Sequence, residues 1–172
     1  MKRLAMTLLG LIVSYTALAD NRSLLVVSEV IGINAPPAKI WNLVKPFDSV
    51  PRWHPAFASA EIVAGRDGKV GAVRALTFKD GPTFTEELLA FNDQSMAFTY
   101  DIVESPLPID RYVSTMSVKP DGRGGSIVTW VGVFSRKNPR DQVPDAENDA
   151  ALIGLITGAY QAGLQNLKKL ME

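Results

Sequence analysis

The segment from Ala58 to Arg136 alternates short runs of β-forming residues with turn signals, and no other feature of the sequence limits the fold as strongly. Turn-forming residues cluster at 66–68, 79–81, 92–94, 105–108 and 120–125. Connections this short join antiparallel neighbours, because a parallel crossover needs about a dozen or more residues. We therefore predict six consecutive strands that form an antiparallel meander.

The C-terminal part of the sequence has the periodicity of a long helix that begins at Pro144 and ends near Leu170. Its apolar residues recur every three or four positions, as on one face of a helix. They are Leu152, Ile153, Ile156, Tyr160, Gly163, Leu164 and Leu167. A continuous apolar stripe must be buried against another element of the fold.

One strand and two short helices are predicted before the meander. Residues 24–33 are rich in β-branched side chains and end at the turn Asn34-Ala35-Pro36-Pro37. The two prolines suit a first helical turn, and the segment that follows offers an apolar face as far as Val44. Further prolines divide residues 47–57 into a second, shorter helical or looped piece. The fold class is therefore α+β, with a seven-stranded curved antiparallel sheet wrapped around the long C-terminal helix.

Residues 1–19 have the order of a secretory signal peptide. Lys2 and Arg3 precede an uncharged apolar stretch, and Ala17-Leu18-Ala19 marks the expected cleavage site. The stretch is shorter than the roughly 20 residues that span a bilayer, so an uncleaved anchor is the less favoured alternative. We expect a periplasmic or secreted protein in which residues 20–172 form one domain, with no membrane span after cleavage.

Charge and composition exclude several classes of function. The chain has 18 basic and 18 acidic residues, and removal of Lys2 and Arg3 leaves 16 against 18, a formal charge of −2. This balance differs from that of nucleic-acid-binding proteins, which carry basic patches. The sequence has one histidine, no cysteine, no Gly-rich phosphate loop and no G-x-S-x-G motif. We therefore expect no metal site, no cofactor and no disulfide.

Two charged residues occur on strand faces that are otherwise apolar, because side chains alternate along a strand. The apolar neighbours are Val70, Ala72, Leu76 and Phe78 for Arg74, and Phe84, Leu88 and Ala90 for Glu86. If Lys79-Asp80-Gly81 is a three-residue loop with Gly81 in the left-handed conformation, Arg74 lies directly opposite Glu86. The sequence thus predicts an inward-facing ion pair in an apolar lining.

The predicted pair has two interpretations. As a structural element it is a salt bridge that orients the sheet, since buried charges are costly unless they are paired. As a functional element it anchors an oxygen atom of a ligand, or acts in catalysis with Arg74 stabilising an oxyanion and Glu86 exchanging a proton at a raised pKa. Both interpretations stay open.

Other candidate ligand-binding residues are aromatic or lie on the helix stripe. We expect Trp53 and Phe57 to cover a pocket, with His54 between them. For His54, packing of its loop is a simpler role than that of a base, because no second histidine or carboxylate motif accompanies it. The remaining candidates are Tyr100, Tyr112, Ile156 and Tyr160. For the two strand tyrosines, pocket lining and a hydrogen-bonded core are equally open, and the sequence leaves the direction of Trp130 undetermined.

These segments, in this order, resemble the START/polyketide-cyclase superfamily, also called SRPBCC. The resemblance covers nearly all of residues 20–172. It rests on residues 35–41, Trp53-His54-Pro55, Gly71-Ala72-Val73-Arg74, residues 85–89 and the terminal helix. It implies a helix-grip fold with a central cavity for lipids, hormones, polyketides or other apolar molecules. In synthase-like members an Arg and a Glu on neighbouring strands serve catalysis, and Arg74 and Glu86 match these positions.

Three functions follow from the residues and the resemblance. The leading interpretation is a periplasmic binding or carrier protein for a small apolar molecule whose polar group meets Arg74, with Tyr100 or Tyr112 as a further contact. The first alternative is a cofactor-independent cyclase or isomerase that uses Arg74 and Glu86. The signal peptide is similar to that of the MxaD-like branch, so the second alternative is an accessory protein that interacts with a periplasmic dehydrogenase.

Overall fold

The computed structural model describes residues 22–140 and 142–172. Within these ranges the chain forms seven strands, two α-helices and two short 3-10 helices. In chain order they are β1 (Leu25–Ile33), α1 (Pro37–Val44), η1 (Val50–Arg52), β2 (Phe57–Ala64), β3 (Val73–Phe78), β4 (Thr83–Asn92), β5 (Ala97–Glu104), β6 (Ile109–Pro120), β7 (Ser126–Arg136), η2 (Asp145–Glu147) and α2 (Asp149–Met171). The predicted signal peptide lies outside the described residues.

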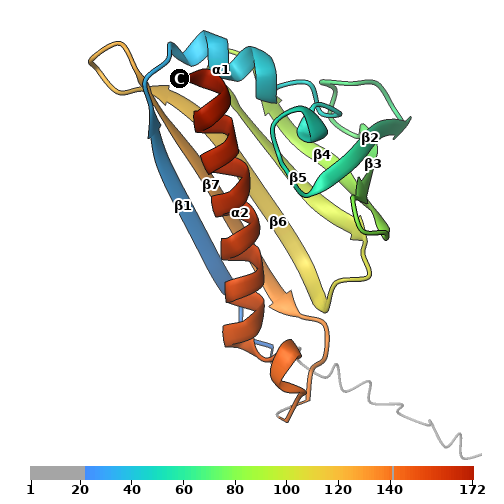
Figure 1. Ribbon diagram of the computed structural model, residues 1–172. Helices are drawn as coiled ribbons and strands as arrows, with labels where there is room; N and C mark the ends of the chain where they lie inside the picture. Colours follow the sequence, from blue (N-terminus) through green and yellow to red (C-terminus); the bar gives the residue numbers. More distant parts are fainter. Residues whose placement is uncertain (1–21, 141) are drawn as a thin grey trace, which may run out of the picture.

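The described strands form one antiparallel sheet in the order β1-β7-β6-β5-β4-β3-β2. Strands β2 to β7 are a meander, as predicted, and β1 closes the sheet by pairing with β7 along its whole length. Figure 1 shows the sheet curved around α2, with α1 across one end and the C-terminus beside it. The predicted α+β helix-grip architecture is confirmed.

The core lies between the concave face of the sheet and α2. Alternate residues of β6 point into it, and the side chains of Leu152, Ile156, Tyr160, Leu164 and Leu167 cover it from the helix. This arrangement buries both the period-two pattern of the strands and the stripe of the helix. Most of the driving force for the fold therefore comes from one continuous apolar layer.

The start of α2 differs from the prediction. Pro144 precedes the 3-10 helix η2, and α2 begins only at Asp149. Asn148 separates the two elements, because its backbone is extended and its side-chain oxygen accepts a hydrogen bond from the Ala151 N–H at 2.9 Å, which caps the helix. Ile153 was expected in the buried stripe but is 37% exposed, since it lies at the edge of that stripe.

The start of β3 also differs from the prediction. Val70 was placed on the strand face with Arg74, but β3 begins at Val73 and Val70 is exposed in the preceding turn. Gly71, with a φ of +85°, ends that turn in a conformation that favours glycine. The inward face of this hairpin therefore starts at Ala72.

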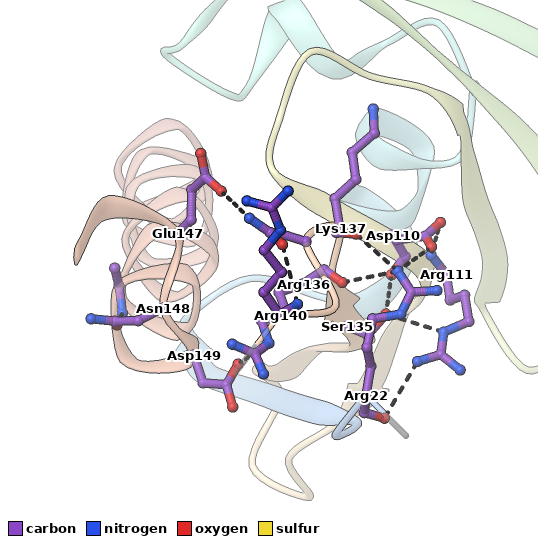
Figure 2. A network of polar contacts seen from close by, with 12 residues as sticks. Arg22, Asp110, Arg111, Ser135, Arg136, Lys137, Arg140, Glu147, Asn148 and Asp149 are labelled. Atoms are coloured by element: carbon purple, nitrogen blue, oxygen red, sulfur yellow. Dashed lines mark hydrogen bonds and ion pairs between the residues drawn. The ribbon is translucent and has the colours of Figure 1, made fainter. Parts of the chain in front are cut away.

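A network of polar contacts joins four segments at the end of the sheet away from α1 (Figure 2). Arg22, just before β1, donates to the carbonyl groups of Arg136 and Lys137 and lies 2.7 Å from the Asp110 carboxylate. Arg136 in turn lies 3.5 Å from Asp149, the first residue of α2. The network thus connects β1, β6 and β7 with the beginning of the helix.

Gly163 allows α2 to approach the loop before β2. A Cβ atom at this position would lie 2.5 Å from the ring of His54, whereas one at Gly158 would meet nothing within 4 Å. We predict that Gly163→Ala lowers the free energy of unfolding by about 1–3 kcal/mol through overpacking. Gly158→Ala, its control on the same helix, should raise that free energy by about 0.5–1 kcal/mol through helix propensity. Urea denaturation measures both, and equal effects would contradict the close packing at Gly163.

Candidate functional site

Arg74 of β3 and Glu86 of β4 are directly opposite each other, as the predicted register requires. Nε and Nη2 of Arg74 lie 2.7 Å and 2.5 Å from the same carboxylate oxygen, Oε2 of Glu86. Both side chains are buried. Gly81, with a φ of +139°, makes the tight connection that sets this register. The hairpin thus places a charge-assisted, doubly hydrogen-bonded pair inside the sheet.

The guanidinium group of Arg74 is also held by aromatic neighbours. Its Nη1 donates to the carbonyl oxygen of Phe47 over 2.5 Å. Its Cζ lies 3.9 Å from the centre of the Phe47 ring and 5.0 Å from that of Tyr100. These contacts stabilise a buried cation by hydrogen bonding and by the electrostatic attraction of the ring faces.

The Glu86 carboxyl group is buried among apolar side chains and poorly solvated. Burial raises its pKa above the ordinary value, and the positive charge of Arg74 opposes that rise. Both hydrogen bonds from Arg74 go to Oε2, so neither is accepted by Oε1. The pair therefore combines a fixed cation with a carboxyl group whose pKa is raised by burial.

His54 has both ring nitrogens in hydrogen bonds to the backbone. Nδ1 accepts from the Ala56 N–H at 3.2 Å, so Nε2 carries the proton and donates to the Ala159 carbonyl of α2 at 2.9 Å. Burial, assisted by the charge of Arg74, lowers the pKa of His54 to about 4. The ring is therefore neutral at pH 7, and it connects the loop before β2 to α2 instead of offering a free base.

A chain of hydroxyl groups crosses the other side of the site. Ser114 Oγ donates its only proton to the Val131 carbonyl, so it must accept from the Tyr160 hydroxyl at 2.8 Å. The Tyr160 hydroxyl then accepts from Tyr112 at 2.5 Å. Ser114 was not among the candidate residues, although its position two residues after Tyr112 on β6 already indicated that it shares that face.

Trp130 points inward, which the sequence did not decide. Its ring stacks on Tyr160 with 4.2 Å between centroids and an angle of 6°. Its Nε1 donates to Ser114 Oγ at 2.9 Å and to the Tyr100 hydroxyl at 3.0 Å. Burial raises the pKa of Tyr100 to about 12, so this phenol stays protonated. The tyrosines thus belong to a hydrogen-bonded wall.

These groups surround a cavity of about 90 Å³. Its wall includes all nine candidate residues: Trp53, His54, Phe57, Arg74, Glu86, Tyr100, Tyr112, Ile156 and Tyr160. It also includes residues that the sequence did not single out, among them Leu107 from the β5–β6 connection, Met116 and Trp130. Leu107 lies in a turn and carried no signal for such a role. The part played by each residue in ligand binding stays a prediction.

Neither a metal centre nor a membrane helix is found in the part of the chain that the structure describes. Over residues 22–140 and 142–172, no three His, Cys, Asp or Glu side chains gather where they could share a metal ion. Among the same residues, neither helix combines the length and the apolarity that a bilayer span requires.

The seven-stranded sheet wrapped around α2 defines a helix-grip fold, and comparison with known proteins gives the family. Residues 25–172 match the family described as polyketide cyclase/dehydrase and lipid transport. The chain belongs to this family, within the SRPBCC superfamily that its sequence resembles.

Solved structures of similar proteins share the fold over most of their length. The protein XoxI from Bacillus cereus is 32% identical, with a TM-score of 0.75 over 86% of this chain and 95% of that chain. An uncharacterised protein from Bacillus thuringiensis is also 32% identical, with a TM-score of 0.72 over 85% of this chain and 98% of that chain.

A plant receptor is similar over part of its sequence. The abscisic acid receptor PYL7 of Arabidopsis thaliana is 32% identical over 102 residues, which are 56% of this chain and 47% of the receptor. The chain thus spans less than half the length of this relative.

The buried histidine predicts a pH-dependent stability. The pKa of His54 is about 4 in the folded protein and about 6.5 in the unfolded chain, so only the unfolded chain gains the proton between these values. The stability that neutral His54 contributes to the folded protein is therefore fully present above pH 6.5. This contribution is lost as the pH falls toward 4. We expect the difference in unfolding free energy between the native protein and His54→Gln to shrink by about 2–3 kcal/mol from pH 7.5 to 4.5. Urea denaturation at both pH values measures this difference in unfolding free energy. An unchanged difference would contradict the lowered pKa of His54.

Proposed function

We propose that this protein binds one small, largely apolar molecule carrying one polar group, in the cavity between α2 and strands β3 to β7. The observation that carries the proposal is the composition of the wall, in which aromatic and aliphatic side chains surround the Arg74–Glu86 pair and the hydroxyl chain. Apolar walls supply affinity, and a few oriented polar groups supply specificity.

The relatives support this proposal. Lipid transport is part of the family description, and the plant relative is by name a receptor for abscisic acid. The predicted signal peptide adds a location, so the proposed protein is a periplasmic or secreted carrier. The accessory function with a periplasmic dehydrogenase stays a prediction, to be decided by isolating a complex from periplasmic extract.

The cavity limits the size of the ligand. At about 90 Å³ it is smaller than a cavity of about 150 Å³ that admits benzene, and well below the roughly 300–1,000 Å³ of sites for drug-sized ligands. A cavity of this size therefore accepts only a few non-hydrogen atoms. A larger occupant requires residues of the wall to move outward.

Native mass spectrometry of the protein purified from periplasm tests the proposal. We expect a stoichiometric increase in mass that is lost after solvent extraction, with the released molecule then identified. A clean protein mass, together with no response to a panel of small apolar molecules, would contradict ligand binding.

A matched pair of helix variants localises the ligand. Ile156→Trp adds bulk inside the cavity wall, whereas Ile153→Trp adds the same group one turn earlier at a position that is 37% exposed. We expect the first variant to lose the bound mass and the second to keep it. Retention by both variants would place the ligand elsewhere on the protein.

The raised pKa of Glu86 favours one further candidate function, proton transfer to or from the bound molecule. In that case Glu86→Gln, which keeps the shape of the side chain, should lower turnover of the identified ligand by about 100-fold or more. The control is Glu87→Gln, the next residue of β4, which lies on the opposite face. Full turnover by Glu86→Gln would exclude this mechanism.

A further inference from the structure

The Arg74–Glu86 pair leaves one carboxylate oxygen without a partner. Nε and Nη2 of Arg74 lie 2.7 Å and 2.5 Å from Oε2 of Glu86, and Nη1 donates to the Phe47 carbonyl oxygen. Oε1 accepts no hydrogen bond from the described part of the chain. An ionised oxygen that is taken out of water without a donor keeps the cost of its lost hydration. Oε1 is therefore an acceptor that a bound molecule can satisfy.

This oxygen also has surface that a molecule in the cavity can touch. Within the described residues, the polar side-chain atoms that are sealed from water and have no hydrogen-bond partner are Trp53 Nε1, Asp101 Oδ1 and Arg136 Nε. Oε1 of Glu86 also lacks a partner but is not one of these atoms, so it is not sealed. Glu86 lines the cavity, and only 4% of the residue is exposed. Its open oxygen therefore faces the cavity.

The charges of the cavity favour an uncharged ligand. Arg74 and Glu86 are both in the wall and neutralise each other. A carboxylate ligand would bring a second negative charge beside Oε1, and an ammonium ligand would bring a second positive charge beside Arg74. Either charge would stand unbalanced in a poorly solvated site. An uncharged donor meets Oε1 without that cost.

We propose that the ligand donates a hydrogen bond to Oε1 of Glu86, which makes it a small uncharged hydroxyl compound, an alcohol. This inference rests on the proposed function and adds the chemical class of the bound molecule. A water molecule that enters the cavity can make the same bond, so a ligand without a donor loses it on binding. A hydroxyl group supplies the donor with one non-hydrogen atom, which suits a cavity of about 90 Å³.

Glu86→Gln would reverse the hydrogen-bonding character of this position. A glutamine side chain has one accepting oxygen and one donating NH₂ group. The Arg74 groups at Oε2 can only donate, so the amide oxygen has to take the place of Oε2. The NH₂ group then takes the place of Oε1 and faces the cavity. A site that favours an alcohol thus becomes one that favours a ketone, which only accepts.

Titration at pH 7, followed by nuclear magnetic resonance, compares three probes of similar shape: cyclobutanol, cyclobutanone and the cyclobutylammonium ion. We expect the native protein to bind the alcohol about tenfold or more tightly than the other two, because the ketone has no donor and the ion carries an unbalanced charge. Glu86→Gln should bind the ketone at least as tightly as the alcohol. Glu87→Gln, on the opposite face of β4, is the control and should keep the native order.

The carboxyl carbon of Glu86 gives a readout in the native protein. Its signal is observed after ¹³C labelling of the glutamate side chains and is assigned by through-bond correlation to the backbone. At saturation, we expect cyclobutanol to shift this signal several-fold more than cyclobutanone does. If circular dichroism shows that Glu86→Gln is unfolded, this shift and the native order of affinities decide the inference.

The outcomes separate this inference from the proposed function. If the native protein binds the alcohol no more tightly than the ketone or the ion, the ligand class is wrong while ligand binding stands. If folded Glu86→Gln keeps the native preference for the alcohol, Glu86 is not the acceptor. If no probe binds, the molecule released from the purified protein decides, since any class other than an uncharged hydroxyl compound overturns the inference. If nothing enters the cavity, the proposed function fails as well.

Discussion

The packing of α2 into the concave face of the sheet is the constraint on which the rest of the structure depends. Tyr160 lies at its centre, with its ring stacked on Trp130 and its hydroxyl group over Gly132, where any side chain would collide with it. Gly163 leaves room for the ring of His54 in the same way. Because these contacts set how closely the helix approaches β7 and the loop before β2, they also set the size of the space left beside β3, β4 and β5.

That space is lined by a wall whose charges and hydrogen bonds are largely balanced within the protein. The Arg74–Glu86 pair carries no net charge, and the hydroxyl groups of Tyr112, Tyr160 and Ser114 donate hydrogen bonds in one direction, which ends at a backbone carbonyl. Such a wall keeps its shape when empty, since few polar groups need water. This is consistent with a family that includes lipid transport, where the protein supplies an apolar interior and a small number of oriented contacts.

Much of this arrangement could be predicted from local patterns. Alternation with period two placed Arg74, Glu86, Tyr100 and Tyr112 on inward faces, and a short turn set the pairing of the first two. Prediction was weaker where the local signal was ambiguous. Pro144 suggested a helix start, but the cap formed by Asn148 delays α2 by several residues. Large residues on both faces of β7 hid the direction of Trp130, and Leu107 in a turn gave no sign that it lines the cavity.

The sequence by itself determined the order of the elements, the antiparallel meander and the opposition of Arg74 to Glu86, because these depend on side-chain periodicity and on connections of a few residues. The tertiary structure decided the properties that depend on distant segments. The neutral state of His54 requires its burial against α2, and the direction of the hydroxyl chain requires Val131 to accept from Ser114. The unpaired N–H of Trp53 is visible only once every neighbour is in place, since hydrogen bonding and burial are properties of the packed chain.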